Sequence, residues 1–355
     1  MGVWNRVRRG ALIALANLGL FAVLFGALEL AYRVRSDGAA STFRALLSSA
    51  GAPHSALDDS RWVVYDPELG YRLNPAQHRM QQLARAAVAP KAEGTTRVLF
   101  LGDSVAFDHP GFVSIAGEAL ADRGRVEVLN GAVPGYTSYQ EVLFFRRHLA
   151  AAEPDLVLWQ YCMNDNHRFL HRFDDEGRML LTEEAKARLT LSPPWDALVR
   201  HSYILRRIHV GLVGTSRQKP ASGYEWEGQA DVSIAWKDYS WREYEQNLAT
   251  LLDLVQQHGA RLAIIAFPLE SQVRHALRLG KDADHLVYVT KPQGMLRRLA
   301  EKYGVPYLDV MPAYVSEYAL GRTFYRDRIH LNDEGHQFTA LQILRFLEDE
   351  RLIPF

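Results

Sequence analysis

An apolar run that ends in a glycine turn and a serine is the feature that most constrains the fold of this chain. Residues 98–104 read Val-Leu-Phe-Leu-Gly-Asp-Ser. A short run rich in Val, Leu and Phe that stops at a glycine is typical of a central strand of a parallel sheet. Because open parallel sheets bind ligands at the carboxyl ends of their strands, we expect Ser104 at the mouth of a crevice. Gly-Asp-Ser is a common tripeptide, so it fits an ordinary strand-ending turn as well as a catalytic serine.

Further apolar runs alternate with helical patterns after this strand. Strands are expected at 126–130, 155–160, 261–267 and 306–310, and helices at 111–123, 138–151, 241–258, 294–303 and from 332 or 333 to about 350. Strands that alternate with helices of this length specify a parallel sheet with right-handed crossovers. The sequence therefore predicts an α/β domain over residues 95–355, a flavodoxin-like three-layer αβα sandwich with about five parallel strands.

The amino-terminal 35 residues predict a membrane anchor. Residues 11–31 are almost wholly apolar, and about 20 such residues span a bilayer as a helix. Arginines lie on both sides of the run, and no small-residue cleavage site follows it directly. We therefore expect residues 1–35 to form a cytoplasmic stub and one transmembrane signal anchor in the cytoplasmic membrane, with the remaining chain facing the periplasm or the cell exterior. A long buried helix of a soluble protein is the alternative, but it would need burial on every side.

Two segments do not follow the alternation of strands and helices. Residues 36–94 are interpreted as a linker that contains a small packed segment, either a hairpin or one packed patch, with a short helix or a tether at 81–92. Residues 167–236 are interpreted as an insertion over the carboxyl edge of the sheet, where loops often carry substrate contacts, or as a purely structural excursion.

Composition excludes several classes of partner and site. The chain carries 41 basic and 41 acidic side chains, so no basic face is indicated and nucleic acid is not an expected partner. Cys162 is the single cysteine, which excludes an internal disulfide and a multi-cysteine metal site.

A carboxylate and an imidazole lie three residues apart before the last predicted helix. They are Asp327 and His330, in a loop that precedes the natural N-cap residues Asn332 and Asp333. A serine hydroxyl is a poor nucleophile until a base takes its proton, and the base must be held in one tautomer by a third group. We expect His330 to accept the proton of Ser104, and Asp327 to bind the other ring nitrogen.

Three hydrogen-bond donors are available for the oxyanion that such an attack creates. They are the backbone N–H groups of Ser104 and Gly135 and the side-chain amide of Asn164, all expected at the carboxyl ends of strands. Glycine lets the backbone approach the substrate without a β-carbon in the way, and an amide is a donor that does not titrate.

These residues resemble the SGNH hydrolases of the GDSL esterase/lipase superfamily, named after the Ser, Gly, Asn and His of four sequence blocks. The blocks are similar to Leu101–Ser104, Asn130–Ser138, Cys162–Asp165 and Asp327–His330, and Gly135 falls on the oxyanion glycine. The chain departs from the pattern at Cys162, where the third block usually has glycine, and at Val105, where the four-letter motif has leucine. Neither departure removes a catalytic group.

The resemblance implies an acyl-serine esterase that uses no cofactor and no metal. Its substrates would be ester-bearing small molecules, lipids or glycans, often acetyl or lipid esters. One alternative is an O-acyltransferase that acts on an envelope polysaccharide, which would exclude water from the acyl-enzyme and bind an acceptor sugar. The other is a non-catalytic tethered binding module, against which the filled catalytic positions argue.

Overall fold

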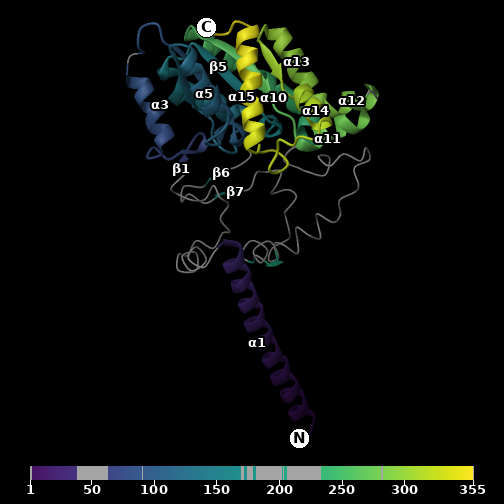
Figure 1. Cartoon of the computed structure of the whole chain (residues 1–355). Coiled ribbons are helices and arrows are strands. Elements are labelled where there is room, and N and C mark those ends of the chain that lie inside the picture. Colours follow the sequence, from purple (N-terminus) through teal and green to yellow (C-terminus); the bar gives the residue numbers. More distant parts are fainter. Residues whose placement is uncertain are drawn as a thin grey trace. The chain divides into compact units, whose positions relative to one another are not determined.

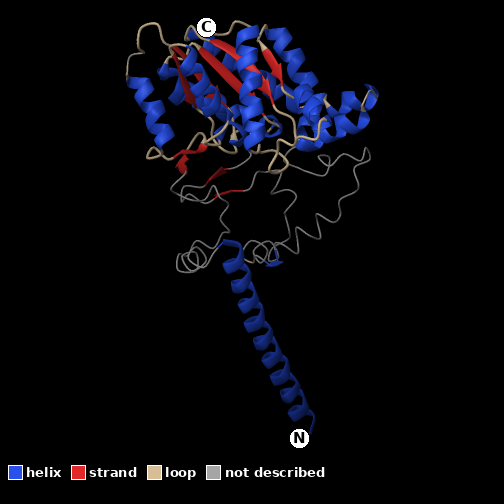
Figure 2. Ribbon diagram, in the orientation of Figure 1, coloured by secondary structure: helices blue, strands red, loops and turns tan. Residues whose placement is uncertain are grey.

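The structure, a computed structural model, describes residues 2–37, 63–89, 91–168, 172–173, 179–180, 202, 204–205, 233–280 and 283–354. The chain divides into two units. One consists of residues 1–55 and 186–218, and the other of residues 56–185 and 219–355. Figure 1 shows the elements in sequence colours and Figure 2 shows them by type.

Five parallel strands form the central sheet of the second unit. They run in the order β4-β3-β5-β8-β9, with bounds β3 Thr96–Leu101, β4 Val126–Asn130, β5 Leu156–Tyr161, β8 Arg261–Ala266 and β9 Tyr307–Asp309. Each strand lies within one or two residues of its predicted position, so the predicted parallel sheet is confirmed. The strand that leads to Ser104 is paired on both edges, by β4 and β5, so it is a central strand of the sheet, as expected.

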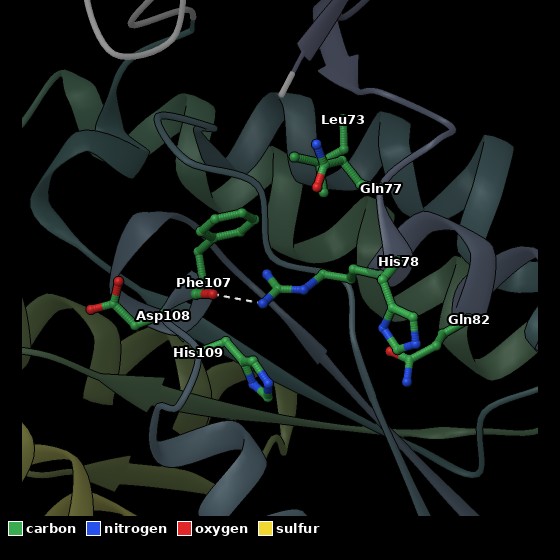
Figure 3. A pocket seen from close by; sticks show the side chains of 8 residues that line it. Leu73, Gln77, His78, Gln82, Phe107, Asp108 and His109 are labelled. Carbon is green, nitrogen blue, oxygen red and sulfur yellow. Dashed lines mark hydrogen bonds between the residues drawn. The ribbon is translucent and has the colours of Figure 1, made fainter. Parts of the chain in front are cut away.

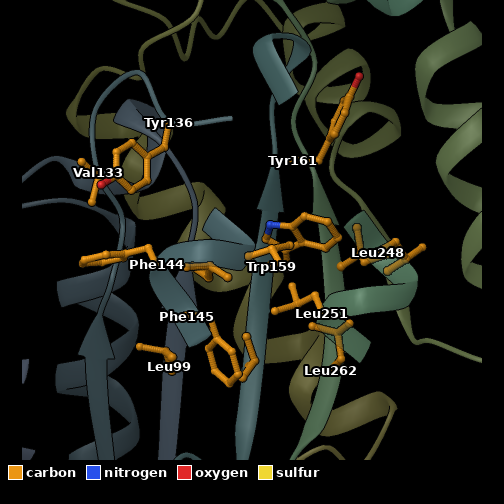
Figure 4. Close-up of a cluster of buried hydrophobic side chains, with 14 of the residues drawn as sticks. Leu99, Val133, Tyr136, Phe144, Phe145, Trp159, Tyr161, Leu248, Leu251 and Leu262 are labelled. Carbon is orange, nitrogen blue, oxygen red and sulfur yellow. The ribbon is translucent and has the colours of Figure 1, made fainter. Parts of the chain in front are cut away.

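Helices cover both faces of this sheet, as Figure 2 shows. Leu99 and Leu101 of β3 join one buried cluster, and Val98 and Phe100 join the other. The first cluster includes side chains of α3 His78–Val88, α6 Ser138–Phe144, α10 Ser240–Gln257 and α13 Lys291–Tyr303. The second includes side chains of α5 Phe112–Arg123, α14 Met311–Ala319 and α15 Asp333–Asp349. The three-layer αβα arrangement expected for this part of the chain is confirmed, and Figure 4 shows the centre of the first cluster.

The structure differs from the predicted helices in two respects. The helix expected at 138–151 is regular only to Phe144 and continues as a π-helix, Phe145–Leu149, and a 3₁₀ turn, Ala150–Ala152. Within the described residues, four helices were not predicted: α4 Ser104–Phe107, α11 Glu270–Leu279, α12 Ala283–Val289 and α14 Met311–Ala319. All four are short, and a short segment gives a helical period few turns in which to show itself.

A small hairpin and a helix precede the sheet. Strands β1 Val63–Asp66 and β2 Gly70–Leu73 pair antiparallel, which confirms the hairpin, and α3 begins three residues before the helix proposed at 81–92. The Tyr71 hydroxyl donates to the carbonyl of Pro134 (2.7 Å), and the Tyr136 hydroxyl donates to the carbonyl of Tyr71 (2.7 Å). These two bonds fasten the hairpin to the loop that contains Gly135.

The first unit contains helix α1, Gly2–Asp37. We expected a membrane-spanning helix over residues 11–31. Among the helices of the described residues, none combines the length and the apolar character needed to cross a membrane. Glu29 of α1 accepts hydrogen bonds from the Ser202 hydroxyl (3.0 Å) and the Ile204 amide (3.0 Å).

Most of the expected insertion at 167–236 lies outside the described residues. Its described parts include two short antiparallel strands, β6 Arg172–Phe173 and β7 Met179–Leu180, and a 3₁₀ turn, Ser233–Trp236. Its described residues 202 and 204–205 belong to the first unit.

Candidate active site

Ser104 lies where the central strand meets a one-turn helix. Strand β3 ends at Leu101, and helix α4 runs from Ser104 to Phe107. The carboxylate of Asp103 caps this helix by accepting a hydrogen bond from the Val105 amide (2.9 Å). Ser104 therefore stands at the carboxyl end of the sheet, the position expected from the apolar run before it.

The turn before Ser104 requires glycine at position 102 because the Gln160 side chain fills the adjacent space. A β-carbon on Gly102 would collide with Oε1 of Gln160. That oxygen already accepts a hydrogen bond from the Asp103 amide (3.1 Å), so Gln160 holds the serine turn from the neighbouring strand β5. We did not predict this role, although a glutamine in an otherwise apolar strand is a visible signal.

The predicted acid and base meet Ser104 in space. Nε2 of His330 lies 2.9 Å from Oγ of Ser104, and Nδ1 of His330 lies 2.8 Å from Oδ2 of Asp327. The second carboxylate oxygen, Oδ1, accepts hydrogen bonds from the amides of Ile329 and His330 (2.8 Å each). Burial opposes ionisation of this carboxyl, but the hydrogen bonds from His330 and Ile329 outweigh it and lower the pKa of Asp327.

This order of contacts determines which ring nitrogen of His330 carries a proton. An ionised carboxylate only accepts hydrogen bonds, so Nδ1 of His330 must carry the proton that faces Asp327. Nε2 of the neutral ring is then the acceptor for the Ser104 hydroxyl. A hydroxyl in contact with a correctly oriented base is the arrangement that nucleophilic catalysis needs.

The two other predicted oxyanion donors belong to one network around the serine. Gly135 has a φ of +74°, a backbone conformation that favours glycine. The amide of Asn164 donates to the carbonyl of Tyr136, the residue after Gly135 (2.8 Å). Its side chain also hydrogen-bonds with Asp103, the residue before Ser104. Asn164 therefore ties the glycine loop to the serine turn.

Comparison with known proteins identifies the family. Residues 100–338, more than half of the chain, match the GDSL-like Lipase/Acylhydrolase family. The chain belongs to this family. It is therefore a hydrolase that acts on ester bonds, as the sequence blocks suggested. No curated protein matches the chain.

Solved structures similar to this acylhydrolase include three esterases or lipases. The acetyl xylan esterase AlAXEase is 13% identical, covers 70% of this chain and 98% of its own, and has a TM-score of 0.43. A lipase/acylhydrolase from Enterococcus faecalis is 12% identical, with 72% and 97% covered and a TM-score of 0.41. A catalytic mutant of an acetylxylan esterase from Geobacillus stearothermophilus is 14% identical, with 73% and 96% covered and a TM-score of 0.42.

Three buried carboxyl groups lie behind the active site of this acylhydrolase. Asp103, Glu141 and Asp165 are all buried, and desolvation raises the pKa of each one. Asp165 accepts a hydrogen bond from the Cys162 amide (2.7 Å), so it stabilises the loop that carries Asn164. Glu141 accepts a hydrogen bond from the Trp159 indole. We did not predict Glu141, because a glutamate in an amphipathic helix is usually exposed.

His336 lies near the acylhydrolase site but does not contact the serine through any bond among the described residues. It is buried, its Nδ1 accepts a hydrogen bond from the Phe112 amide (3.2 Å), and its Nε2 lies 3.3 Å from Oδ2 of Asp108. His336 therefore packs at the start of α15.

Proposed function

We propose that this acylhydrolase cleaves its ester through an acyl-serine intermediate, with Ser104 as nucleophile, His330 as general base and acid, and Asp327 as the residue that orients His330. The observation that supports these roles is the continuous chain of contacts from Asp327 through His330 to Ser104, 2.8 and 2.9 Å long. The proposed substrates are acetyl or lipid esters of a small molecule, a lipid or a glycan.

In the first half-reaction, Oγ of Ser104 attacks the ester carbonyl while Nε2 of His330 takes the hydroxyl proton. The imidazolium that forms is stabilised by the Asp327 carboxylate. The C–O bond to the alcohol then breaks, and His330 returns the proton to the leaving alcohol. The acyl group remains on Ser104.

In the second half-reaction, His330 removes a proton from water, which attacks the acyl-serine carbonyl. The tetrahedral intermediate collapses, the acid leaves, and Ser104 recovers its proton from His330. In both halves we propose that the backbone amides of Ser104 and Gly135 and the side-chain amide of Asn164 stabilise the oxyanion. Such donors contribute about 3 kcal/mol each where they have been removed in other enzymes.

The test is turnover of p-nitrophenyl acetate by the full chain and by Ser104→Ala, with Ser316→Ala as the control. Ser316 is an exposed serine on α14 whose hydroxyl donates to the Pro312 carbonyl (3.0 Å), so its loss should leave the rate unchanged. Rapid quenching followed by mass spectrometry should find one acetyl group on the peptide that contains Ser104. Turnover that persists in Ser104→Ala, or an acetyl group on another residue, would overturn the proposed roles. A rate that rises on addition of an oligosaccharide acceptor would favour acyl transfer instead.

The membrane location stays a prediction of the sequence. It is supported by the apolar residues 11–31 and by side chains of α1 that no described part of the chain covers, such as Leu18, Phe21 and Leu24. We propose that this segment holds the enzyme at the cytoplasmic membrane, with the catalytic unit outside. Cell fractionation of the full chain and of a chain that begins at residue 36 tests this. An untruncated chain that is released by alkaline carbonate would contradict it.

A further inference from the structure

A cavity of about 480 Å³ lies next to the helix that carries Ser104 (Figure 3). One wall is formed by residues 107–109, at and just after the end of α4, the helix that begins with Ser104. The other wall comes from β2 and the start of α3, in the segment before residue 100. That second wall lies outside the part of the chain that matches the family, residues 100–338. The volume is within the range of small-molecule sites, about 300–1,000 Å³.

Arg79 is the charged side chain that links the two walls. Its Nη2 donates to the carbonyl of Phe107 (2.6 Å), and its guanidinium carbon lies 4.1 Å from the centre of the Phe107 ring. No acidic side chain among the described residues forms an ion pair with Arg79, and its Nη1 is buried with no hydrogen-bond partner there. Burial lowers the pKa of Arg79 to about 10, so the side chain keeps its charge at neutral pH. The cavity therefore holds a fixed positive charge that no described acidic side chain pairs with directly.

The one acidic residue of the cavity, Asp108, is engaged elsewhere. Its Oδ2 lies 3.0 Å from Nη2 of Arg326 and 3.3 Å from Nε2 of His336. Asp108 therefore makes its direct contacts with Arg326 and His336, and it acts on Arg79 through its charge without forming an ion pair with it. The exposed side chains of His78 and His109 add polar groups to the wall, and Figure 3 shows both beside the cavity. Helix α3 begins at His78, so its positive amino-terminal end lies at the same place.

The cavity adjoins the two segments that carry Ser104 and His330. Phe107 follows Ser104 by one helical turn, about 5 Å along the helix axis. Arg326, which holds Asp108, belongs to the loop of His330, and its amide donates to the His330 carbonyl (3.0 Å). His330 is the group proposed to protonate the leaving alcohol, so the alcohol must approach this loop.

We propose that the cavity binds an oxyanion group, a carboxylate or a phosphate, on the alcohol part of the ester, with Arg79 as its principal charged contact. This inference rests on the proposed function, and it names the class of substrate: esters of acidic alcohols. The anion would be attracted to a guanidinium that the Phe107 carbonyl already holds in place, and charge-assisted bonds to such a group are among the strong ones in proteins.

The test compares two aryl acetates that differ in one charge, 4-acetoxybenzoate and methyl 4-acetoxybenzoate. The two esters differ in intrinsic reactivity, so they are not compared with each other directly. For each ester, kcat/KM of the variant is compared with kcat/KM of the natural protein. Arg79→Met should lower kcat/KM for the anionic ester by about tenfold and leave the neutral ester within about twofold. Arg79→Lys should recover part of the loss. Arg85→Met removes the same charge from an exposed position on the same helix and should change neither value.

Activity with the neutral ester also reports whether Arg79→Met is folded, and a thermal melt provides a second check if that activity is lost. A binding measurement separates this proposal from the proposed catalytic roles. Calorimetry on Ser104→Ala should detect 4-hydroxybenzoate and phenyl phosphate, and the double variant with Arg79→Met should bind both more weakly. The stronger of the two ligands identifies carboxylate or phosphate as the preferred group. Equal losses for both esters, or binding that does not depend on Arg79 in a folded protein, would overturn the proposal. A third outcome separates the two proposals. If ligand binding depends on Arg79 but turnover does not depend on Ser104, the anion site would be supported and the proposed catalytic roles would be overturned.

Discussion

The Nε2 atom of His330 lies 2.9 Å from Oγ of Ser104, although 226 positions of sequence separate the two residues. The contact exists because both residues stand at the carboxyl side of the same sheet. Ser104 begins helix α4 directly after β3, and His330 lies in the loop that ends at the N-cap of α15. The Asn332 side chain caps α15 by accepting a hydrogen bond from the Gly335 amide (2.8 Å), which fixes the end of that loop.

Asp327→Asn should reduce kcat by roughly 10⁴-fold. Its oxygen would still accept the two backbone amides of the loop, so its NH₂ group would face Nδ1 of His330. The ring would then carry its proton on Nε2 and could not accept the proton of Ser104. Steady-state kinetics with p-nitrophenyl acetate check this, and Asp333→Asn, an exposed acid close to the same loop, is the matched control. A loss of less than about tenfold would show that Asp327 does not set the tautomer.

Asn164→Ala should lower kcat by about 10²- to 10³-fold and change KM little, since an oxyanion donor acts mainly in the transition state. The substitution also removes the bond to the Tyr136 carbonyl, so some loss of stability is expected. Kinetics should therefore be measured well below the melting temperature of the variant. A rise in KM with unchanged kcat would contradict the proposed role and would indicate a contact to the bound ester.

Gly102→Ala should destabilise the fold by about 1–3 kcal/mol and reduce activity. The new methyl group meets Gln160, and this glutamine cannot turn away without giving up its bond to the Asp103 amide. Gly124→Ala is the control, because nothing lies within 4 Å of a β-carbon at that position. Urea unfolding of both variants measures the difference. Equal stability of the two variants would mean that the serine turn tolerates a side chain.

Glu141→Gln should make the stability of the enzyme less dependent on pH. Desolvation raises the pKa of Glu141 above its ordinary value near 4.5, so the folded state binds this proton more tightly than the unfolded state does. Its contribution to stability is therefore full below that ordinary value and is lost as the pH rises through the pKa of the folded state. The neutral glutamine has no such loss, so the variant should become more stable relative to the natural protein as the pH rises above the ordinary value.

Urea unfolding at several pH values checks this difference. Glu118→Gln, at an exposed position on α5, should follow the natural protein at every pH. A Glu141→Gln variant whose stability falls with pH as steeply as that of the natural protein would show that Glu141 is ionised in the fold.

The strands and the candidate triad were predictable because their signals are local. A strand that is buried on both faces must be apolar throughout, as β3 and β5 are, and this pattern is visible without any tertiary contact. Parallel strands separated by helices must all end at one edge of the sheet. Residues that directly follow those strands, such as Ser104 and Asn164, are therefore brought together by topology alone.

Other features depend on contacts that leave little trace in the sequence. The π-helical turn after α6, the burial of Glu141 and the collision that excludes a side chain at Gly102 each depend on which residue lies opposite. The sequence predicts the hairpin through its pattern of aromatic and polar residues. It gives no sign that Tyr71 attaches this hairpin to the Gly135 loop.

Apolar periodicity and strand order are properties of the chain, so they were enough to predict a parallel α/β sheet with a serine, a histidine and an aspartate at its carboxyl edge. The distances among these groups, the network that links Asn164 to both neighbouring loops, and the lack of an ion pair for Arg79 among the described residues could be read only from the folded structure. These depend on packing between distant segments, where a shift of one ångström makes or breaks a hydrogen bond.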